Sequence, residues 1–489
     1  MNKTNPTAEK EKSIAQENNQ SFAKINTRSF LFVTALLLAI LLITGALSYF
    51  IPGGSFDRDE NGALIEGTYE IGEIDGIAVW RILTAPVRVF FAPGCITIIM
   101  ISVFVMIMSG VFNLVEKTHG IHIFMHRIVK RFSHRKKLVC CLCVLAFMLF
   151  GSFFGMFEEL VTLLPFMVMF ALSLGLDTLT GLCICLVGAC FGFAAAITNP
   201  FSVELIASFA GTNMMDGVWL RIVFFLITYG VLCAFLLRHV NKIEKKPSAS
   251  LTFELDEQKR IRLEKLPDVP EEKAKKILRA YGVFVGIQLA VLLAIAFVRA
   301  ISGFAVPILA ASFLFGGIAC GLVICENKKD PFRYLWQGIA AMAPAVIMIG
   351  IASSVRLVLE ESGIMDTVVH GIIQVLGGRG PFVSILLIFL LILLMQVFID
   401  SASAKIILII PILLPVCATL GVSIPTLTLA YCLADGFTNV FVPTGPVLLI
   451  GLSMADVSYG KWVRFTWKLQ AVLLALSILV LFFASKIGY

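Results

Sequence analysis

Two short polar segments interrupt long apolar stretches of this 489-residue chain, and they carry ionisable groups where lipid is expected. The first contains the adjacent carboxylates Glu158 and Glu159. The second contains Asp400, Ser401, Ser403 and Lys405. An ionised carboxylate at the centre of a bilayer costs about 2.5–3.5 kcal/mol by insertion scales, so such groups usually face a cavity. The segments are therefore candidates for binding a polar solute, although the glutamates can instead lie at the interface or pair with the other segment.

The two polar segments correspond to each other through an internal duplication. When the sequence is shifted by 246 positions, residues coincide with their own type: Pro165 with Pro411, Gly175 with Gly421, Thr180 with Thr426, and Thr198 with Thr444. The same shift places Glu159 on Lys405. Opposite charges at equivalent tips can neutralise each other, or can separate to hold the two ends of a zwitterion. Duplicated, interrupted hydrophobic segments are a sequence pointer to the binding site of a secondary transporter.

Each copy also contains a later interruption that includes proline. These interruptions are residues 198–200 and residues 442–446. Proline lacks the backbone donor and leaves a carbonyl free one turn earlier. Those carbonyls, together with Thr198, Asn199 and Thr444, are candidates for binding substrate or a cation. Simple helix kinks are the alternative.

Further polar groups inside the apolar segments extend this candidate site. Asp435 and Asn439 are four residues apart and share one helix face. We expect that face to look into the same cavity, with hydrogen bonding between helices as the competing use. Thr198, Asp400 and Asp435 are the predicted cation ligands, with Na⁺ or H⁺ as the coupling ion.

The composition identifies lipid as the solvent of most of the chain. Hydrophobic residues make up 58% and charged residues 15%, and no soluble fold has enough interior to bury that apolar surface. The net charge of +7 lies mainly beside hydrophobic spans, so it indicates orientation and not nucleic-acid binding. Most of the 12 cysteines lie in apolar runs without zinc-type spacing, which predicts neither a metal centre nor a disulfide framework. Arg356 lies inside a span and needs a partner, and Glu360 one turn later is the expected one.

The apolar segments predict an all-α polytopic membrane protein. Crossings are expected at residues 30–51, 94–116, 178–198, 218–238, 280–300, 304–325, 338–358, 425–443 and 464–487. The segments 138–175 and 382–419 each contain a polar tip near the middle, and we interpret them as re-entrant helical hairpins. Two full crossings each is the alternative. The crossings that end at the proline interruptions become two broken transmembrane helices, whose irregular backbone must line a cavity or lie inside protein.

The chain divides into two membrane repeats joined by a charged linker. The predicted parts are a tail at residues 1–28, a first repeat at 29–239, a linker at 240–279 and a second repeat at 280–489. Basic residues concentrate on one side of this scheme, which predicts a cytoplasmic N-terminus, tail and linker. An odd number of crossings between Pro165 and Pro411 predicts an inverted repeat. Amphipathic stretches near residues 121–132 and 365–376 precede the hairpins and predict interfacial arm helices.

These residues resemble the YfcC-like branch of the anaerobic dicarboxylate carrier (DcuC-type) family, within the ion transporter superfamily. The resemblance covers nearly the whole chain and rests on Phe154–Glu159, Thr198–Phe201, Asp400–Lys405, Ala434–Asn439 and Pro443–Thr444. The chain departs from the family pattern at Ala402, where glycine is usual, and at Gly445, where serine is expected. The resemblance implies that the substrate lies among Glu158, Glu159, Asn199, Ser401, Ser403, Lys405, Asn439 and Thr444. It also implies alternating access, a homodimer and a bacterial cytoplasmic (inner) membrane location.

The expected function is secondary active transport of small carboxylate-bearing metabolites. Amino acids, with the arginine–ornithine exchange implied by the resemblance, rank ahead of C4 dicarboxylates because Glu158 and Glu159 attract an amino group and repel a dianion. A dicarboxylate carrier is the alternative. An enzyme is not expected, since an intramembrane hydrolase would rest only on Ser401 or Ser403 beside Lys405. The expected partners are a small solute and the lipid bilayer, with no nucleic acid, cofactor or resident metal.

Overall fold

The computed structural model describes most of the chain as helix. The described residues are 27–57, 65, 67–72, 76–93, 95–120, 123, 135–264, 270–297, 304–376 and 380–489. Within them, β structure is confined to the two-residue strands β1 (Gly54–Ser55) and β2 (Glu70–Ile71), which pair antiparallel. The predicted tail and the first predicted arm near residues 121–132 lie almost entirely outside the described residues.

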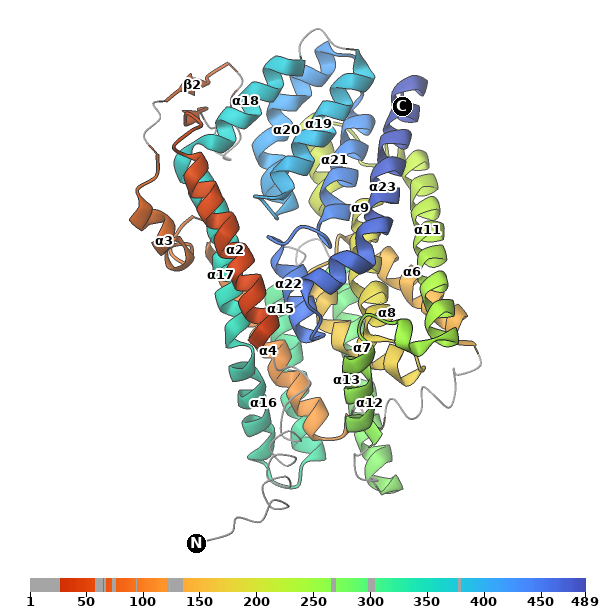
Figure 1. Ribbon diagram of the computed structural model, residues 1–489. Helices are drawn as coiled ribbons and strands as arrows, with labels where there is room; N and C mark the ends of the chain where they lie inside the picture. The colour runs from red at the N-terminus through yellow and green to blue at the C-terminus, as the bar shows by residue number, and fades with distance from the viewer. Residues whose placement is uncertain are drawn as a thin grey trace.

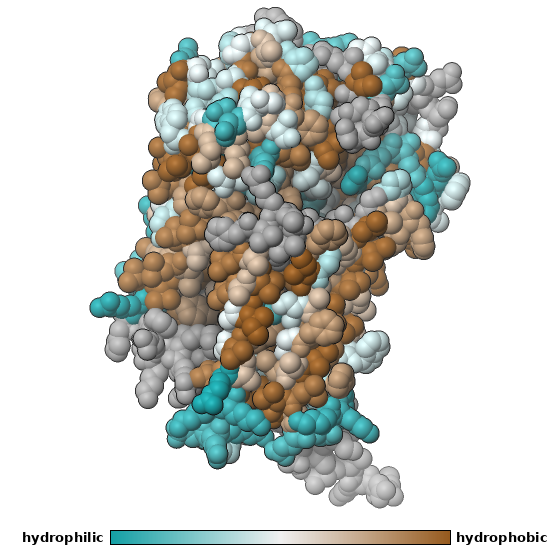
Figure 2. Space-filling model, turned by 180° about the vertical axis from the view of Figure 1, so that it is seen from behind, coloured by the Kyte–Doolittle hydropathy of each residue, from teal (hydrophilic) through white to brown (hydrophobic). Residues whose placement is uncertain are grey.

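Six described helices are long and apolar enough to cross a membrane. They lie in α4 (Cys95–Lys117), α6 (Lys136–Phe154), α11 (Val218–Lys245), α15 (Ala305–Ile324), α20 (Ala402–Thr419) and α23 (Tyr459–Ile487). A bent pair, α16 (Asp330–Ala341) and α17 (Ala343–Ser362), passes the same test as a seventh span. The predicted class, an all-α polytopic membrane protein, is confirmed. Apolar side chains cover most of the face in Figure 2, and a dense hydrophilic cluster lies at its lower end.

The helices form two groups that face each other. One group, which we call the scaffold, contains α2 (Thr27–Leu47), α3 (Val79–Arg88), α4, α13 (Glu271–Phe297), α15, α16 and α17. Within it α4 packs against α15 and α16, and α17 packs against α2 and α3. The other group, which we call the hairpin group, contains α6–α11 and α19–α23 (Figure 1). Helix α18 (Ile364–Leu376), at the position of the second predicted arm, connects α17 to α19.

The first hairpin, predicted at residues 138–175, consists of α6, the 3₁₀ helix η2 (Glu159–Leu163) and α7 (Leu164–Ser173). Helix α6 ends at Phe154 and is capped by Gly155, whose φ of 66° is the left-handed conformation that glycine adopts readily. The Lys136 ammonium donates a hydrogen bond of 3.5 Å to the carbonyl of Leu174, so the two ends of the segment meet. The segment therefore doubles back on itself.

The second hairpin, predicted at residues 382–419, consists of α19 (Pro381–Gln396) and α20, joined by residues 397–401. A Cβ atom on Gly421 would lie 3.9 Å from Cγ of Pro381, so this segment also returns to its starting end. In Figure 1, α19 and α20 lie in the upper half of the view, whereas α7 and α8 lie in the lower half. The re-entrant character of both hairpins stays a prediction, because it depends on where the bilayer surfaces lie.

Element boundaries follow the duplication after each hairpin. Helix α8 (Thr178–Leu182) begins 246 residues before α21 (Ile424–Thr438). Both have a side-chain N-cap at equivalent positions: Asp177 accepts from the backbone NH of Thr180 at 3.0 Å, and Ser423 accepts from that of Thr426 at 3.2 Å. A π-helical segment, η3 (Cys183–Val187), connects α8 to α9 (Gly188–Ala194).

The second parts of the broken helices also begin at equivalent residues. In the first copy, Pro200 opens the π-helical segment η4 (Pro200–Glu204), followed by α10 (Leu205–Ala210). In the second copy, Pro446 opens α22 (Pro446–Met454). Proline suits this position because its fixed φ is helical and its missing donor would have no partner in the first turn. The two predicted breaks are therefore present in the described backbone.

The two copies touch at equivalent residues. The Cys190 thiol donates a hydrogen bond of 2.8 Å to the carbonyl of Gly436, which stands 246 positions later. A Cβ atom on Gly436 would lie 2.3 Å from Cα of Ala194, so this close crossing of α9 and α21 requires glycine. A pseudo-two-fold axis that passes through this crossing would bring equivalent positions of the two copies into contact, as observed here. The inverted orientation of the copies in the membrane stays a prediction.

The linker folds against the foot of the first hairpin. It contains the 3₁₀ helix η5 (Pro247–Ala249) and α12 (Phe253–Glu264). The carboxylate of Asp256 accepts hydrogen bonds from the backbone NH (3.1 Å) and hydroxyl (2.6 Å) of Thr178. The buried ammonium of Lys259 donates to the carbonyl of Ala455 at 2.8 Å. The linker is thereby attached to both copies of the hairpin group.

Candidate substrate site

A cavity of about 230 Å³ lies where the scaffold meets the tips of the hairpins. Its polar lining residues are Glu158 from the first tip, Asp400 and Ser401 from the second tip, Thr444 from the second break, and Ser353, Arg356 and Glu360 from α17. Apolar residues such as Ile98, Leu357 and Phe398 complete the wall. The structure therefore brings Glu158 of the first tip and Asp400 and Ser401 of the second tip to one cavity.

Two helix N-termini converge on this cavity. Helix α20 begins after Ser401, whose hydroxyl accepts from the backbone NH of Ala404 at 3.4 Å, and both residues line the cavity. Helix α22 begins at Pro446, another lining residue, and its N-cap Gly445 offers no side-chain oxygen. Free backbone NH groups and the helix dipole at an N-terminus favour an anionic group such as a carboxylate.

The scaffold contributes one ion pair to the cavity wall. The Nε atom of Arg356 lies 2.7 Å from Oε1 of Glu360, which confirms the predicted partner. Both side chains are partly exposed and both line the cavity. With Glu158 and Asp400, the lining holds three carboxyl groups and one guanidinium. The wall therefore carries an excess of negative charge when all four groups are ionised.

Lys405 lies behind the cavity and not in its wall. Its ammonium forms an ion pair with Oδ1 of Asp435 and donates to Oε1 of Gln396. Gln396 in turn donates from Nε2 to Oδ1 of Asn439. Lys405 and Asp435 are fully buried. Asp435 and Asn439 share a helix face, as predicted, and this face binds the base of the second hairpin tip.

Within this buried network, Asp435 is incompletely satisfied. Its Oδ2 atom accepts no hydrogen bond from any described residue. A buried carboxylate oxygen is costly without a donor, a proton or a cation beside it. Gln396, which links Lys405 to Asn439, was not predicted to be functional. Its only signal is an amide at the end of an apolar run, immediately before the polar tip.

The first break is packed against the first tip. The Ser152 hydroxyl donates to the carbonyl of Ala195 (2.7 Å) and accepts from the backbone NH of Ile197 (3.1 Å). Asn199 is fully buried, and its Oδ1 caps η4 by accepting from the NH of Phe201 at 2.9 Å. Its Nδ2 atom has no partner among the described residues. Asn199 therefore lies inside this packed break, and its side chain does not line the cavity.

The threonines of the two breaks make similar contacts. The hydroxyl of Thr198 donates to the carbonyl of Phe153 at 3.1 Å, and that of Thr444 donates to the carbonyl of Val397 at 2.7 Å. Each bond joins a break to the end of the hairpin's first helix in the same copy. Of the two, only Thr444 also lines the cavity.

The predicted site residues thus fall into three places. Those in the cavity wall are Glu158, Asp400, Ser401 and Thr444; those in the buried network are Lys405, Asp435 and Asn439; those in the first break are Thr198 and Asn199. Ser403 is half-buried in the first turn of α20 and does not line the cavity. The side chain of Glu159 lies outside the described structure.

Helical hairpins, broken helices and a cavity with ionisable groups in its wall, where the hairpin tips meet the scaffold, are features of polytopic membrane transporters. The chain belongs to the C4-dicarboxylate anaerobic carrier family, whose model matches residues 30–486.

Known proteins similar to the chain include two bacterial relatives. A protein of Escherichia coli strain K12, YfcC, described as a proposed basic amino acid antiporter, is 22% identical over 491 residues, covering 93% of this chain and 96% of the relative. An uncharacterized protein of Haemophilus influenzae is 26% identical over 403 residues, covering 79% of this chain and 76% of that protein. The crystal structure of the Alcanivorax borkumensis YdaH transporter is 19% identical with a TM-score of 0.43, covering 94% and 98% of the two chains.

Proposed function

We propose that the protein is a secondary transporter of amino acids, with basic amino acids as the preferred class, working by alternating access. The observation that carries this proposal is the mixed lining of the cavity. The N-termini of α20 and α22 offer backbone NH groups to a substrate carboxylate. Glu158 and Asp400, in the same wall, offer carboxylates to substrate amino groups.

The charge balance of the cavity supports a cationic substrate over a dianion. Glu360 is paired with Arg356, and Glu158 and Asp400 add two further carboxyl groups to the cavity wall. Two carboxylates in a small, partly apolar space repel a dicarboxylate and attract an ammonium or guanidinium group. The description of the E. coli relative as a proposed basic amino acid antiporter agrees with this preference.

A C4 dicarboxylate is the second candidate substrate. The family description favours it, and Arg356 is a guanidinium in the cavity wall that can hold a carboxylate with two hydrogen bonds. For this substrate Arg356 would have to exchange Glu360 for the ligand, and Glu158 or Asp400 would have to be protonated.

We also propose that a proton or Na⁺ couples to transport through the buried network. Asp435 has an oxygen without a donor and lies on the helix that follows the second hairpin. Lys405, its partner, stands one residue after cavity-lining Ala404. A charge change at Asp435 can therefore alter the position of the second tip. Thr198, Asp400 and the other sequence-predicted ligands remain part of this proposal.

The substrate test is a counterflow experiment with purified protein in liposomes. Liposomes are loaded with arginine, ornithine, succinate or malate, and uptake of labelled arginine and labelled succinate is measured with and without Na⁺. Arginine uptake driven by internal ornithine is the expected result. Succinate uptake that internal amino acids do not affect would overturn the amino acid proposal and support the dicarboxylate alternative.

The role of Glu158 is tested with Glu158→Gln. We expect arginine exchange to fall at least about tenfold, equivalent to about 1.4 kcal/mol, while expression and thermal unfolding stay unchanged. The matched control is Glu361→Gln, which removes a partly exposed carboxylate of α17 that pairs with Arg88 outside the cavity. Equal activity of Glu158→Gln and wild type would remove Glu158 from the mechanism.

Orientation, location and assembly are further proposals. The distribution of basic residues supports a cytoplasmic N-terminus in a bacterial inner membrane. Labelling of single cysteines placed in the linker and in the loop near β1, from outside intact cells, checks this orientation. The mass of the purified protein in a lipid disc checks the homodimer.

A further inference from the structure

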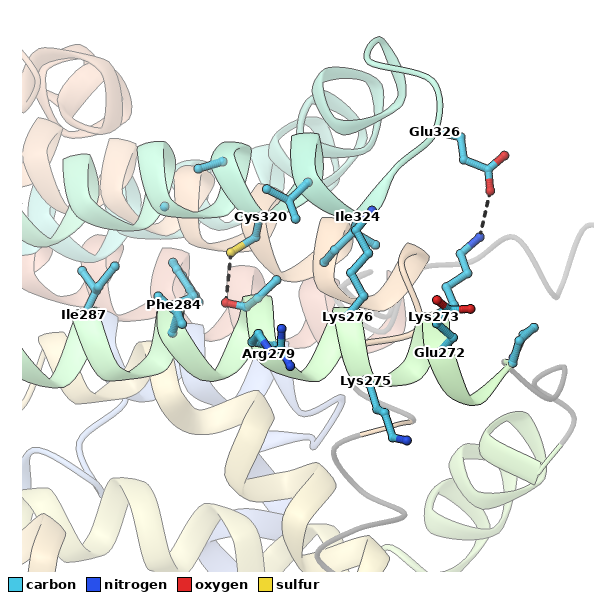
Figure 3. A pocket seen from close by; sticks show the side chains of 16 residues that line it. Glu272, Lys273, Lys275, Lys276, Arg279, Phe284, Ile287, Cys320, Ile324 and Glu326 are labelled. Carbon is cyan, nitrogen blue, oxygen red and sulfur yellow. Dashed lines mark hydrogen bonds and ion pairs between the residues drawn. The ribbon is translucent and has the colours of Figure 1, made fainter.

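A second and larger cavity lies on the scaffold, away from the hairpin tips. It is an open groove of about 1000 Å³ between α13 and α15 (Figure 3). Its apolar walls include Val283, Phe284 and Ile287 from α13, and Gly316, Ala319, Val323 and Ile324 from α15. Val283, Ile287 and Val323 are each about half exposed, at 59%, 49% and 52%. The groove therefore presents apolar side chains outward, where lipid is the expected neighbour.

One end of the groove is basic. Lys273 lies there and pairs with Glu326 across the groove mouth at 3.3 Å. Lys275 pairs with Glu271 at 3.0 Å and points away from the groove in Figure 3. Neither lysine therefore leaves a full positive charge for a ligand.

Two further cations stand at this end, where the carboxylate of Glu272 also lines the groove. Lys276 and Arg279 both line the groove and are exposed, and neither makes an ion pair or hydrogen bond with any described residue. They stand three residues apart on α13, so they share one helix face. They form a two-cation site that can take an anionic group at the mouth of the groove.

The dimensions of the groove match one leaflet of a bilayer. From Lys276 to Ile287 the axis of α13 rises about 16 Å at 1.5 Å per residue. Half of the hydrocarbon thickness of a bilayer is about 15 Å. Small residues of α15 keep the floor open: Ala319 lines it, and a Cβ atom on Gly316 would lie 2.8 Å from the ring of Phe284. The groove is thus long enough for an acyl chain to lie along it.

We propose that this groove is a binding site for an anionic phospholipid of the surrounding membrane. The phosphate lies against Lys276 and Arg279, where arginine can donate two parallel hydrogen bonds. One acyl chain follows the apolar walls toward Ile287. Basic pockets between transmembrane helices on the cytoplasmic side have this chemistry, and the positive-inside prediction places this end of α13 there. Charge complementarity selects an anionic lipid over a zwitterionic one.

The test measures lipid retention by the purified full-length protein. Delipidated protein is mixed with equal amounts of phosphatidylglycerol and phosphatidylethanolamine that have the same acyl chains, and bound lipids are counted by native mass spectrometry. The wild type is expected to retain phosphatidylglycerol preferentially. The variant Lys276→Gln/Arg279→Gln is expected to lower that retention about thirtyfold, since each of the two basic residues near a membrane surface contributes about 1 kcal/mol.

A matched control is available on α23. Lys461 and Arg464 are also an exposed lysine and arginine three residues apart, and neither lines the groove. The variant Lys461→Gln/Arg464→Gln changes the net charge equally and is expected to retain phosphatidylglycerol as the wild type does. Equal loss in both double variants would overturn the site, because it would show general surface attraction only.

A second variant tests the contribution of the apolar groove separately from that of the two charges. Ala319→Phe fills the floor of the groove without changing any charge, and it is expected to abolish selective retention. Unchanged retention in this variant would overturn the proposal. The proposal would also be overturned if the wild type were a dimer without bound lipid and Ala319→Phe were a monomer. The groove would then be an interface between two copies of the chain. Size-exclusion profiles and thermal unfolding establish that each variant is folded.

Discussion

The two helix breaks occupy equivalent positions in the duplicated fold but differ in what surrounds them. In the first copy, Asn199 fills the space beside the first tip: a Cβ atom on Gly155 would lie 2.3 Å from its Oδ1. In the second copy the equivalent residue is Gly445, and a Cβ atom there would lie 3.3 Å from Oδ1 of Asp400 in the cavity wall. The first break is filled by the side chain of Asn199, whereas the second adjoins the cavity through Thr444 and Pro446.

This difference indicates that the two copies share a backbone arrangement, but that their breaks have different roles: the first is packed, and the second contributes to the cavity. The first break is held by Ser152 and Asn199, both fully buried. The second break supplies Thr444 and the start of α22 to the cavity. The first copy adds Glu158 to the cavity from its tip and not from its break. The following predictions test this asymmetry, beginning with the largest expected effect.

Lys405→Met should be the most damaging single change, because it leaves Asp435 buried without its cation. Breaking a buried ion pair from one side costs about 3–5 kcal/mol. Thermal unfolding in detergent measures the loss. The double variant Lys405→Met/Asp435→Leu removes both charges and should recover most of the stability. If the single variant were as stable as wild type, the network would not be an ion pair holding the second tip.

The cap of α8 should make the first copy sensitive to acid. Burial raises the pKa of Asp177, but the hydrogen bond and charge of His239, with hydrogen bonds from Ser250 and Thr180, outweigh it and lower the pKa to about 2. An unfolded aspartate titrates near pKa 3.9. The depressed value stabilises the fold by about 2–3 kcal/mol above pH ~4, and this contribution is lost as the pH falls toward 2.

Asp177→Asn checks this sign. Its free energy of unfolding should be lower than that of the wild type at pH 6, and the difference should shrink at pH 3. Ser423→Ala, at the equivalent cap of α21, is the control, and its cost of about 1 kcal/mol should not depend on pH. A difference between Asp177→Asn and wild type that is the same at both pH values would contradict the assignment.

Gly445→Asn converts the second break into the sequence of the first. The new side chain should enter the cavity beside Asp400 and raise the KM for exchange about tenfold, which corresponds to about 1.4 kcal/mol. Stability should not fall, because asparagine is a good N-cap for α22. Gly230→Asn in α11, where a Cβ atom would meet nothing within 4 Å, is the matched control. An unchanged KM in Gly445→Asn would place the substrate elsewhere.

Asn199→Ala should have the smallest effect. Loss of an N-cap side chain costs about 1 kcal/mol of stability, and the KM for exchange should stay at the wild-type value because the side chain is buried in the first break. Thermal unfolding and counterflow measure the two quantities on the same preparation. A KM that rises as far as it does in Gly445→Asn would show that the first break also reaches the substrate, as the family resemblance implies.

Much of the backbone could be predicted from the sequence because duplication and proline leave strong signals. The position of Pro200 and Pro446 predicts where the broken helices resume, and the structure begins η4 and α22 there. The hairpins follow from polar tips inside apolar stretches, since an apolar segment with a central charge is difficult to place across a bilayer in any other way. These features depend on local chemistry, which a sequence displays directly.

The side-chain directions could not be predicted in the same way. Ala404 lines the cavity, whereas Lys405, the next residue, points into the buried network. Successive residues of a helix are about 100° apart around its axis, so the face that meets a cavity depends on how the helix packs. The duplication paired Lys405 with Glu159 by position, but its partner is Asp435, which is 30 residues distant in sequence and adjacent only after folding.

The linker contacts were missed for a related reason. Asp177 reads as an ordinary N-cap, and Asp256 reads as one of several charges in a polar stretch. In the structure both carboxylates lie at the start of α8. Asp256 accepts a hydrogen bond from Thr178, and Asp177 accepts hydrogen bonds from Thr180 and Ser250. Only the return of the chain after α11 brings them together, and no local pattern records that return.

The contact of Cys190 with Gly436 has a mechanical consequence. Helix α6 packs on α9, and α19 packs on α21, so each hairpin is fastened to one arm of the same tight crossing. Because the backbones of α9 and α21 approach this closely at Gly436, any sliding of one helix past the other would make them clash. We therefore expect any displacement of one hairpin tip relative to the scaffold to carry the other tip with it.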